Sequence, residues 1–158
     1  MKFSIRQATS LDIEEVITLC IKLAEFESQF THNKPSPDQI RERVAYDFLE
    51  RGRCAYFVAE SDGNIIGIIK VARKENGHGK VSEAYVEERY RGNGIMTELF
   101  KEALKWSQSH GITSLYLTVV NGNKHAFAFW RKCGFSFESY IGDLLIKMSM
   151  SVSQQVAG

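Results

Sequence analysis

The feature that most constrains the fold of this chain is a glycine-containing turn between two segments of different periodicity. Residues 81–86 read as a strand, whereas apolar residues from Ile95 onward recur at helical spacing. The sequence RYRGNG, at residues 89–94, joins the two segments. Such a turn gathers backbone N–H groups at the positive end of a helix, and glycine leaves room for a bulky anion. The junction therefore predicts a binding site for a phosphate or pyrophosphate group.

Length and composition favour one compact domain. The chain has 158 residues, of which 44% are hydrophobic and 25% are charged, so it can enclose a core without disulfide or metal staples. We assign residues 1–150 to a single domain and 151–158 to a C-terminal tail. The formal net charge of +1 gives no general attraction to nucleic acid or to a membrane surface, and neither is an expected partner.

Cysteine and histidine usage argues against disulfides and metal sites. Cys20, Cys54 and Cys133 are odd in number, far apart and embedded in apolar sequence, so we expect them to be reduced. The four histidines lack metal-ligand spacing, and no metal is expected. The first residues do not resemble a signal peptide, and no later apolar run is long enough to span a bilayer. These observations favour a cytoplasmic protein.

The first third of the chain predicts one strand and two helices. Residues 3–6 alternate as a short strand, and Thr9 or Ser10 then caps a helix, with Asp12 placed to complete the cap. The helical period is lost at residues 25–33, which we expect to begin an irregular surface loop. Pro37 is well placed at the start of a second helix, residues 38 to about 51.

The remainder predicts strands and helices in alternation. Expected strands cover residues 54–60, 65–73, 81–86 and 114–120, with one or two more between 137 and 148; helices begin at 95 and cover 124–132. Hairpins followed by strand–helix–strand crossovers indicate an α/β fold, with a mixed central sheet and helices on both faces. The apolar last strands can pair across a homodimer.

Two linked motifs resemble the GCN5-related N-acetyltransferase (GNAT) family. Its central signature is Gln or Arg, two residues, Gly, one residue, then Gly or Ala, which matches residues 89–94. A second signature, Asn-x-x-Ala followed by an aromatic residue and closing on Gly-Phe, matches residues 123–135. The resemblance covers almost the whole chain and implies a sheet that splays between the motif strand and the next one. The segment LAEFE, residues 23–27, is similar to the diamine and thialysine acetyltransferase branch.

The resemblance implies that the bound anion is the pyrophosphate of acetyl-coenzyme A. Backbone N–H groups of residues 91–96 would hold it, and main-chain groups of residues 84–86 would pair with the pantetheine arm. The expected coenzyme-binding residues are Ala84, Tyr85, Val86, Arg89, Arg91, Gly92, Asn93, Gly94, Ile95, Met96, Thr97, Asn123 and Trp130.

Acetyl transfer to an amine needs a proton acceptor, because a free alkylamine with a pKa of about 10.4 is protonated at neutral pH. Glu83, on the motif strand, is the candidate general base, since family members often keep an acidic residue there. The alternative is a solvated residue, or a partner for a nearby arginine.

The coenzyme leaves as a thiolate, and a general acid could protonate its sulfur. Many relatives place a tyrosine at the position of Trp130, whose indole cannot donate a proton in this way. Tyr140 is the candidate replacement and Tyr116 the alternative, although both residues are also suited to packing. A thiol with a pKa of roughly 8.5 can also leave largely unaided, which would leave Trp130 to wall the thioester slot.

The acceptor is expected at the irregular loop. Glu25, Phe26, Glu27 and Phe30 would receive a cationic, partly apolar amine; a solvated helix end with aromatic anchors is the alternative.

The combined expectation is an acetyl-coenzyme A-dependent N-acetyltransferase, using direct attack by a small-molecule or peptide amine in a ternary complex. The departure at Trp130 leaves open a catalytically weak coenzyme-binding sensor or interaction module. An acetyltransferase that acts on nucleic acid is disfavoured, because the near-neutral net charge of the chain gives no general attraction to a polyanion.

Overall fold

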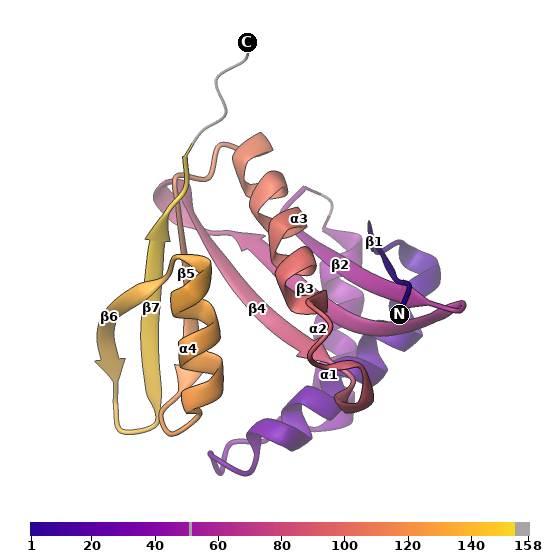
Figure 1. Cartoon of the computed structure of the whole chain (residues 1–158), viewed down its shortest axis with the longest axis horizontal. Helices are drawn as coiled ribbons and strands as arrows, with labels where there is room; N and C mark the ends of the chain where they lie inside the picture. Colours follow the sequence, from indigo (N-terminus) through magenta and orange to yellow (C-terminus); the bar gives the residue numbers. More distant parts are fainter. Residues whose placement is uncertain (51, 154–158) are drawn as a thin grey trace.

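The computed structural model describes residues 1–50 and 52–153 (Figure 1). The strands are β1 (Ser4–Gln7), β2 (Cys54–Ser61), β3 (Asn64–Arg73), β4 (His78–Val86), β5 (Ser114–Val120), β6 (Ser136–Ile141) and β7 (Leu145–Ser151). The helices are α1 (Ile13–Glu27), α2 (Pro37–Leu49), α3 (Ile95–Ser109) and α4 (Lys124–Cys133), with short 3-10 turns η1 (Ser10–Asp12), η2 (Glu75–Gly77) and η3 (Glu88–Tyr90).

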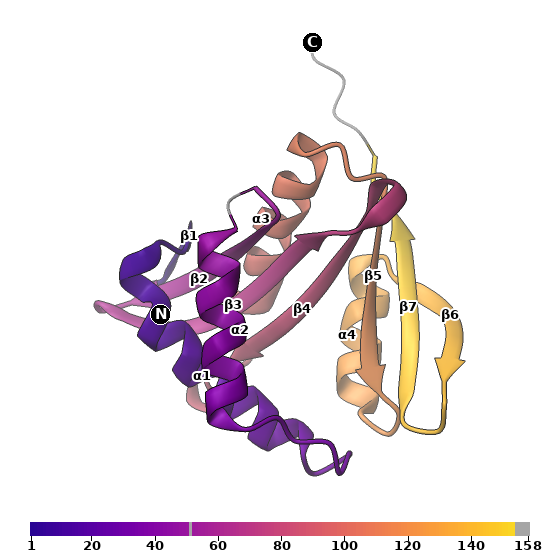
Figure 2. The same ribbon diagram turned by 180° about the vertical axis from the view of Figure 1, so that it is seen from behind.

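All seven strands form one mixed sheet in the order β1-β2-β3-β4-β5-β7-β6. Only β4 and β5 run parallel; every other neighbouring pair is antiparallel. Helices α3 and α4 cover one face, and α1 and α2 cover the β2–β4 part of the other face (Figures 1 and 2). The predicted fold class, a mixed sheet with helices on both faces, is confirmed.

The sheet opens between β4 and β5. These strands pair only from His78 opposite Ser114 to Lys80 opposite Tyr116, and they then diverge toward the C-terminal end of β4. The register of β4 against β3 also shifts at Glu83, whose φ of 51° marks a β-bulge. The splay that the family resemblance implied is therefore present, and it leaves β4 without a neighbouring strand on one side from Val81 to Val86.

Two hydrophobic clusters hold the layers together. The cluster under α3 and α4 includes Val71, Leu99, Leu115, Phe135 and Met148. The cluster under α1 and α2 includes Val16, Ile40, Val44, Val58 and Ile68. Because strand side chains alternate between faces, one sheet supplies both clusters.

Several predicted boundaries shift. Thr9 is the residue that caps the first turn, and Asp12 completes the capping box. The expected loss of helical structure from residue 25 is wrong, because α1 continues to Glu27. Helix α2 ends at Leu49, two residues short of the expected boundary, and Arg51 lies outside the described residues.

The start of the expected C-terminal tail belongs to the folded domain. Strand β7 extends to Ser151. Val152 is buried, and its N–H donates to the carbonyl of Thr113. Residues 154–158 of the expected tail lie outside the described residues.

Within residues 1–50 and 52–153, no helix has the length and apolar character needed to cross a membrane. In this part of the chain, no group of three or more His, Cys, Asp or Glu side chains is arranged to hold a metal ion. The three cysteines are free thiols: Cys20 is buried, and Cys54 and Cys133 are half-buried.

Candidate active site

A cleft of about 840 Å³ occupies the opening between β4 and β5. One wall is β4 from Lys80 to Val86, and the opposite wall is β5 from Leu117 to Val120. The start of α3 lies at one end of the cleft, and one face of α4 closes a side. The β5 residues were not among the predicted site residues; the splay implied by the resemblance was the signal that points to them.

The glycine turn forms the mouth of this cleft. Gly92 and Gly94 have φ values of 81° and 76°, in the left-handed region where side chains are strained. A Cβ built on either would meet no atom within 4 Å, so the space in front of the turn is open. Gly94 is the N-cap of α3 and has no side chain with which to cap the N–H groups of the first turn. These groups can therefore bind an anion.

Arg91 lies at the mouth of the cleft and contacts α1 through Phe26. Its Nε donates to the carbonyl of Val86 at 2.8 Å. Its guanidinium lies 5.7 Å from the ring centre of Phe26 and 5.3 Å from that of Tyr85. A positive charge is thus fixed beside the glycine turn, against the last turn of α1.

Most of the predicted coenzyme-binding residues line the cleft: Ala84, Tyr85, Val86, Arg91, Gly92, Gly94, Ile95, Met96, Thr97, Asn123 and Trp130. Arg89 and Asn93 do not line it. The guanidinium of Arg89 donates to the hydroxyl of Tyr90 at 2.7 Å and lies over its ring. The Asn93 side chain donates to the carbonyl of Tyr90 at 2.8 Å, which stabilises the turn from behind.

Asn123 and Trp130 mark the α4 side of the cleft. The Oδ1 of Asn123 accepts from the N–H of Ala126 at 3.1 Å, so this side chain is the N-cap of α4. Trp130 is 7% exposed and makes edge-on contacts with Phe100 and Phe135. Trp130 is therefore a core residue with one surface on the cleft, which fits the predicted role as a wall.

A second cavity of about 400 Å³ adjoins the cleft on the α1 and α2 side of the sheet. Glu27, Glu83 and Val120 line both cavities, so they lie where the two meet. The rest of the second cavity comes from the end of α1, the loop after it, α2, and the turn between β6 and β7. This arrangement gives the cleft a separate opening away from the glycine turn.

Charged side chains cluster at the junction of the two cavities. Nη2 of Arg43 lies 2.8 Å from Oε1 of Glu83, whose side chain is 15% exposed. Within the described residues, the buried Nε of Arg43 has no hydrogen-bond partner. Burial, followed by the charge of Glu83, raises the pKa of Glu27. Burial and Glu83 also raise the pKa of the Cys20 thiol, so that thiol is a poor nucleophile.

Arg43 was missed by the sequence reasoning. It lies on α2 next to the inward-facing Val44, and nothing in the local pattern distinguishes it from a solvated arginine. The alternative expected for Glu83, a partner for a nearby arginine, matches the observed ion pair.

The structure does not bring three other predicted site residues to either cavity. Tyr140 lies on the edge strand β6, is 65% exposed, and packs edge-on against Phe137. The expectation that it donates a proton in the cleft is therefore wrong. Glu25 is exposed on the outer side of α1. Phe30 contacts the ring of Phe26 edge-on at 5.7 Å and supports it from behind.

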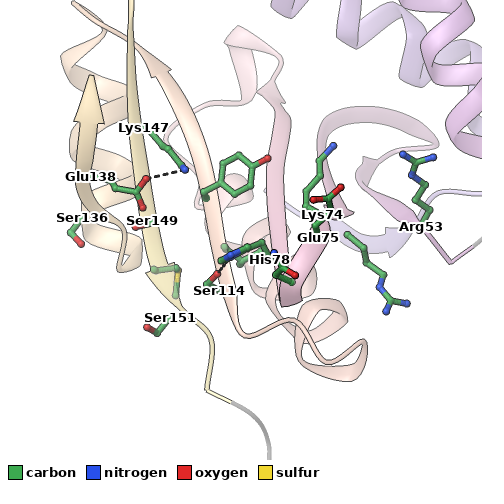
Figure 3. A pocket seen from close by; sticks show the side chains of 15 residues that line it. Arg53, Lys74, Glu75, His78, Ser114, Ser136, Glu138, Lys147, Ser149 and Ser151 are labelled. Atoms are coloured by element: carbon green, nitrogen blue, oxygen red, sulfur yellow. Dashed lines mark hydrogen bonds and ion pairs between the residues drawn. The ribbon is translucent and has the colours of Figure 1, made fainter. Parts of the chain in front are cut away.

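A third hollow, of about 1000 Å³, lies at the opposite end of the sheet (Figure 3). Its sides carry Arg53, Lys74, His78 and Lys147, and the last of these pairs with Glu138 at 2.9 Å. Tyr116, the alternative acid, lines this hollow and not the cleft. None of the residues predicted to bind the coenzyme or the acceptor, or to act in catalysis, lines it; Tyr116 was only the alternative acid.

Comparison with known proteins agrees with these features. A family model described as "Acetyltransferase (GNAT) family" matches residues 20–135. An N-acetyltransferase of Methanocaldococcus jannaschii is 24% identical over 142 residues, covering 84% of this chain. Streptothricin acetyltransferase A of Bacillus subtilis is 30% identical over 86 residues, covering 54% of this chain. The matches span 60% and 49% of the lengths of these two relatives.

Solved structures share the fold. The crystal structure of the PaiA N-acetyltransferase from Thermoplasma acidophilum, in complex with coenzyme A, superposes with a TM-score of 0.79 at 22% identity, covering 96% of this chain and 99% of that one. A GNAT-family acetyltransferase from Staphylococcus aureus Mu50 also gives 0.79, at 17% identity, with 96% and 100% coverage. The likeness to the diamine and thialysine branch stays a prediction.

Proposed function

This chain belongs to the acetyltransferase (GNAT) family, and from that premise we propose that it transfers the acetyl group of acetyl-coenzyme A to a primary amine. The amine attacks the thioester directly, in a complex that holds both substrates. The observation that carries the proposal is the pair of connected cavities, with an anion-binding turn at one end and carboxylates at their junction.

The larger cleft suits the coenzyme. Its mouth offers the free N–H groups of the α3 start and the charge of Arg91, which match a pyrophosphate. The open edge of β4 offers main-chain groups to an extended arm, in the manner of an added strand. A solved neighbour was crystallised with coenzyme A, which supports the same class of ligand here.

The smaller cavity suits the acceptor. Glu27, Glu83 and Asp143 contribute negative charge to its lining, and Arg43 contributes positive charge. A primary amine is cationic in solution and is drawn to such a lining. The amine is either a small molecule or the end of a peptide, because the cavity opens to the surface between the α1–α2 loop and the β6–β7 turn.

Two carboxylates can take the proton that the amine must lose. Glu83 lies on the motif strand and lines both cavities, so we assign it as the general base, acting directly or through a water. Its ion pair with Arg43 holds the carboxylate in place at the junction of the two cavities. Glu27 faces the same junction, and its raised pKa makes it the alternative proton acceptor.

The thiolate leaves without a tyrosine at the α4 position. The Trp130 indole cannot supply a proton, and Tyr140 is outside the cleft. A free thiol has a pKa of roughly 8.5, so its anion is a tolerable leaving group at neutral pH. Trp130 then acts as an apolar wall that keeps water from the thioester.

Calorimetric titration with acetyl-coenzyme A tests the first half of the proposal. Saturable binding, with loss of affinity as salt rises, is expected for a pyrophosphate held by N–H groups and an arginine. A broad panel of primary amines, assayed by release of the coenzyme thiol, tests the second half. Absence of binding at high micromolar coenzyme would disprove the proposal.

A coenzyme-binding sensor with little catalysis is the second candidate. One observation favours it: the Glu83 carboxylate is engaged by Arg43. The family resemblance adds the expectation of a tyrosine at the position of Trp130. Tight coenzyme binding without thiol release for any amine in the panel would select the sensor. Thiol release that depends on one class of amine would select the enzyme.

A further inference from the structure

Lys80 lies at the closed end of the coenzyme cleft. It is the last β4 residue paired with β5, opposite Tyr116, and the strands separate directly beyond it. The side chain is half-buried and lines the cleft. The glycine turn and Lys80 therefore mark the two ends of one continuous channel along β4.

The ammonium group of Lys80 has no ion-pair or hydrogen-bond partner among the described residues. Two other lysines on this sheet have carboxylate partners: Lys70 pairs with Asp47 at 2.6 Å, and Lys147 pairs with Glu138 at 2.9 Å. Burying a charged ammonium group without a partner costs free energy. This cost disappears when the amine loses its proton, so the neutral form is favoured.

The charges around Lys80 act in the same direction on balance. Burial comes first, followed by the positive charges of Lys74 and Lys70, and together they lower the pKa of Lys80; Arg43 adds to this, whereas Glu83 opposes it. Each unit by which the pKa falls raises the fraction of neutral, nucleophilic amine about tenfold at neutral pH.

The coenzyme would bring its thioester toward this amine. If the pyrophosphate is held at the glycine turn, the opposite, acetylated end of the molecule lies deeper in the channel. From Val86 to Lys80 the strand rises roughly 20 Å, at about 3.3 Å per residue. An extended pantetheine arm laid along β4 points its acetylated end toward Glu83 and on toward Lys80, and these two side chains lie close enough for their charges to interact.

We infer that Lys80 is an internal acetyl acceptor, which becomes acetylated by the bound coenzyme when no amine occupies the adjoining cavity. This inference rests on the proposed function. In the step, the lone pair of Lys80 Nζ attacks the thioester carbonyl, and an N–C bond forms as the C–S bond breaks. The coenzyme leaves as a thiolate, which takes up the proton released by the nitrogen. The product is a neutral amide at the closed end of the channel.

An acetylated Lys80 would inhibit acetyl transfer to an external amine. It removes a positive charge and places an acetyl group where the next thioester must sit. Turnover of an external amine is therefore expected to fall in proportion to the acetylated fraction of Lys80, and coenzyme affinity is expected to weaken.

The test is incubation of the full chain with isotopically labelled acetyl-coenzyme A, without any acceptor amine. Proteolysis after glutamate releases residues 76–83, in which Lys80 is the sole lysine, and residues 99–102, in which Lys101 is the sole lysine. Lys101 is exposed on α3 and reports ordinary chemical acetylation. Lys80 is expected to label at least about tenfold faster than Lys101, because the cleft holds the thioester beside Lys80 and not beside Lys101. The rate should saturate with coenzyme and be independent of protein concentration.

Two variants sharpen the result. Lys80→Arg keeps the positive charge and should abolish the fast label, whereas Lys74→Arg, outside the cleft, should leave the Lys80 label unchanged. Labelling of Lys80 no faster than that of Lys101, in protein that binds the coenzyme, would overturn this inference alone. A label that rises in proportion to protein concentration would overturn it too, because it indicates transfer between molecules. Failure to bind the coenzyme would overturn the proposed function and this inference together.

Discussion

The carboxylate of Glu83 and the guanidinium of Arg43 lie 2.8 Å apart where the two cavities meet. Glu83 reaches this position because the β4 bulge, with its φ of 51°, interrupts the alternation of the strand. Arg43 reaches it from α2, forty residues earlier in the chain. One strained residue and one helix thus set the charge beside the proposed point of transfer.

Replacing Glu83 with Gln should slow amine acetylation about 100-fold near neutral pH, because the amine loses its nearby proton acceptor. The deficit should shrink toward alkaline pH, where the amine is already neutral. Steady-state rates across pH would measure this. Glu88→Gln, at an exposed site next to the turn, is the matched control and should change little. An unaltered pH–rate profile in the Glu83 variant would remove it as the base.

Glu27→Gln should stabilise the fold at neutral and alkaline pH. Burial and the charge of Glu83 raise the pKa of Glu27 above its ordinary value of 4.5. The ionised form is therefore disfavoured in the folded state, and stability is lost as pH rises through the folded pKa. Thermal unfolding should show a gain for the variant at about pH 8 and none at about pH 4. Glu25→Gln, exposed on the same helix, should behave like the parent at both values. A gain at acid pH would contradict the assignment.

Asp47→Ala should destabilise the packing of α2 on the sheet by about 3 kcal/mol, because it leaves a buried charge without its partner. Oδ2 of Asp47 accepts from Lys70 Nζ and from the hydroxyl of Tyr56, each at 2.6 Å. The side chains of Asp47 and Lys70 are each 12% exposed. Urea unfolding would give the change in free energy.

An exposed ion pair gives the comparison for the Asp47 variant. Glu102 and Lys105 lie on the surface of α3 at 3.1 Å. Glu102→Ala should therefore cost less than about 1 kcal/mol. Equal losses in the two variants would show that Asp47 contributes no more than a surface charge.

Gly94→Ala should weaken coenzyme binding beyond its effect on stability. At a φ of 76° the new side chain should cost about 1 kcal/mol of stability. Gly63→Ala, in the β2–β3 turn at a φ of 78°, has similar strain far from the cleft and should cost the same. Only the Gly94 variant should lose coenzyme affinity, by about tenfold or ~1.4 kcal/mol, because its methyl group crowds the anion. Calorimetric titration with the coenzyme would measure the affinity of both variants, and an equal loss of affinity in the two would contradict a specific role for Gly94.

The sequence predicted most of what depends on local pattern. The element order, a helix cap at Thr9 or Ser10 and the glycine turn before α3 each follow from periodicity or from one residue's conformational preference, and the structure selects Thr9 as the cap. The end of α1 was missed because Phe26 does not extend the apolar face of the helix; it packs instead on Phe30 and Arg91.

The rest depends on contacts between distant segments. The ion pair of Arg43 with Glu83 joins α2 to β4, and no local spacing encodes it. Tyr140 was assigned to the cleft, but β6 is the edge strand of the sheet and is separated from β5 by β7, so Tyr140 is 65% exposed there. Helix and strand patterns place residues along an element, whereas bulges and side-chain pairing decide which residues meet.

Because β4 pairs with β5 over only three residues, the rest of β4 has unpaired main-chain groups like those of an edge strand, although β4 lies in the middle of the sheet. An edge on the outside of a protein can pair with any other polypeptide, and such edges favour aggregation. Here the open main-chain groups of β4 lie at the bottom of a cleft, with β5, α3 and α4 around them. The elements around the opening therefore separate these main-chain groups from the edges of other polypeptides, while a molecule inside the cleft can still reach them.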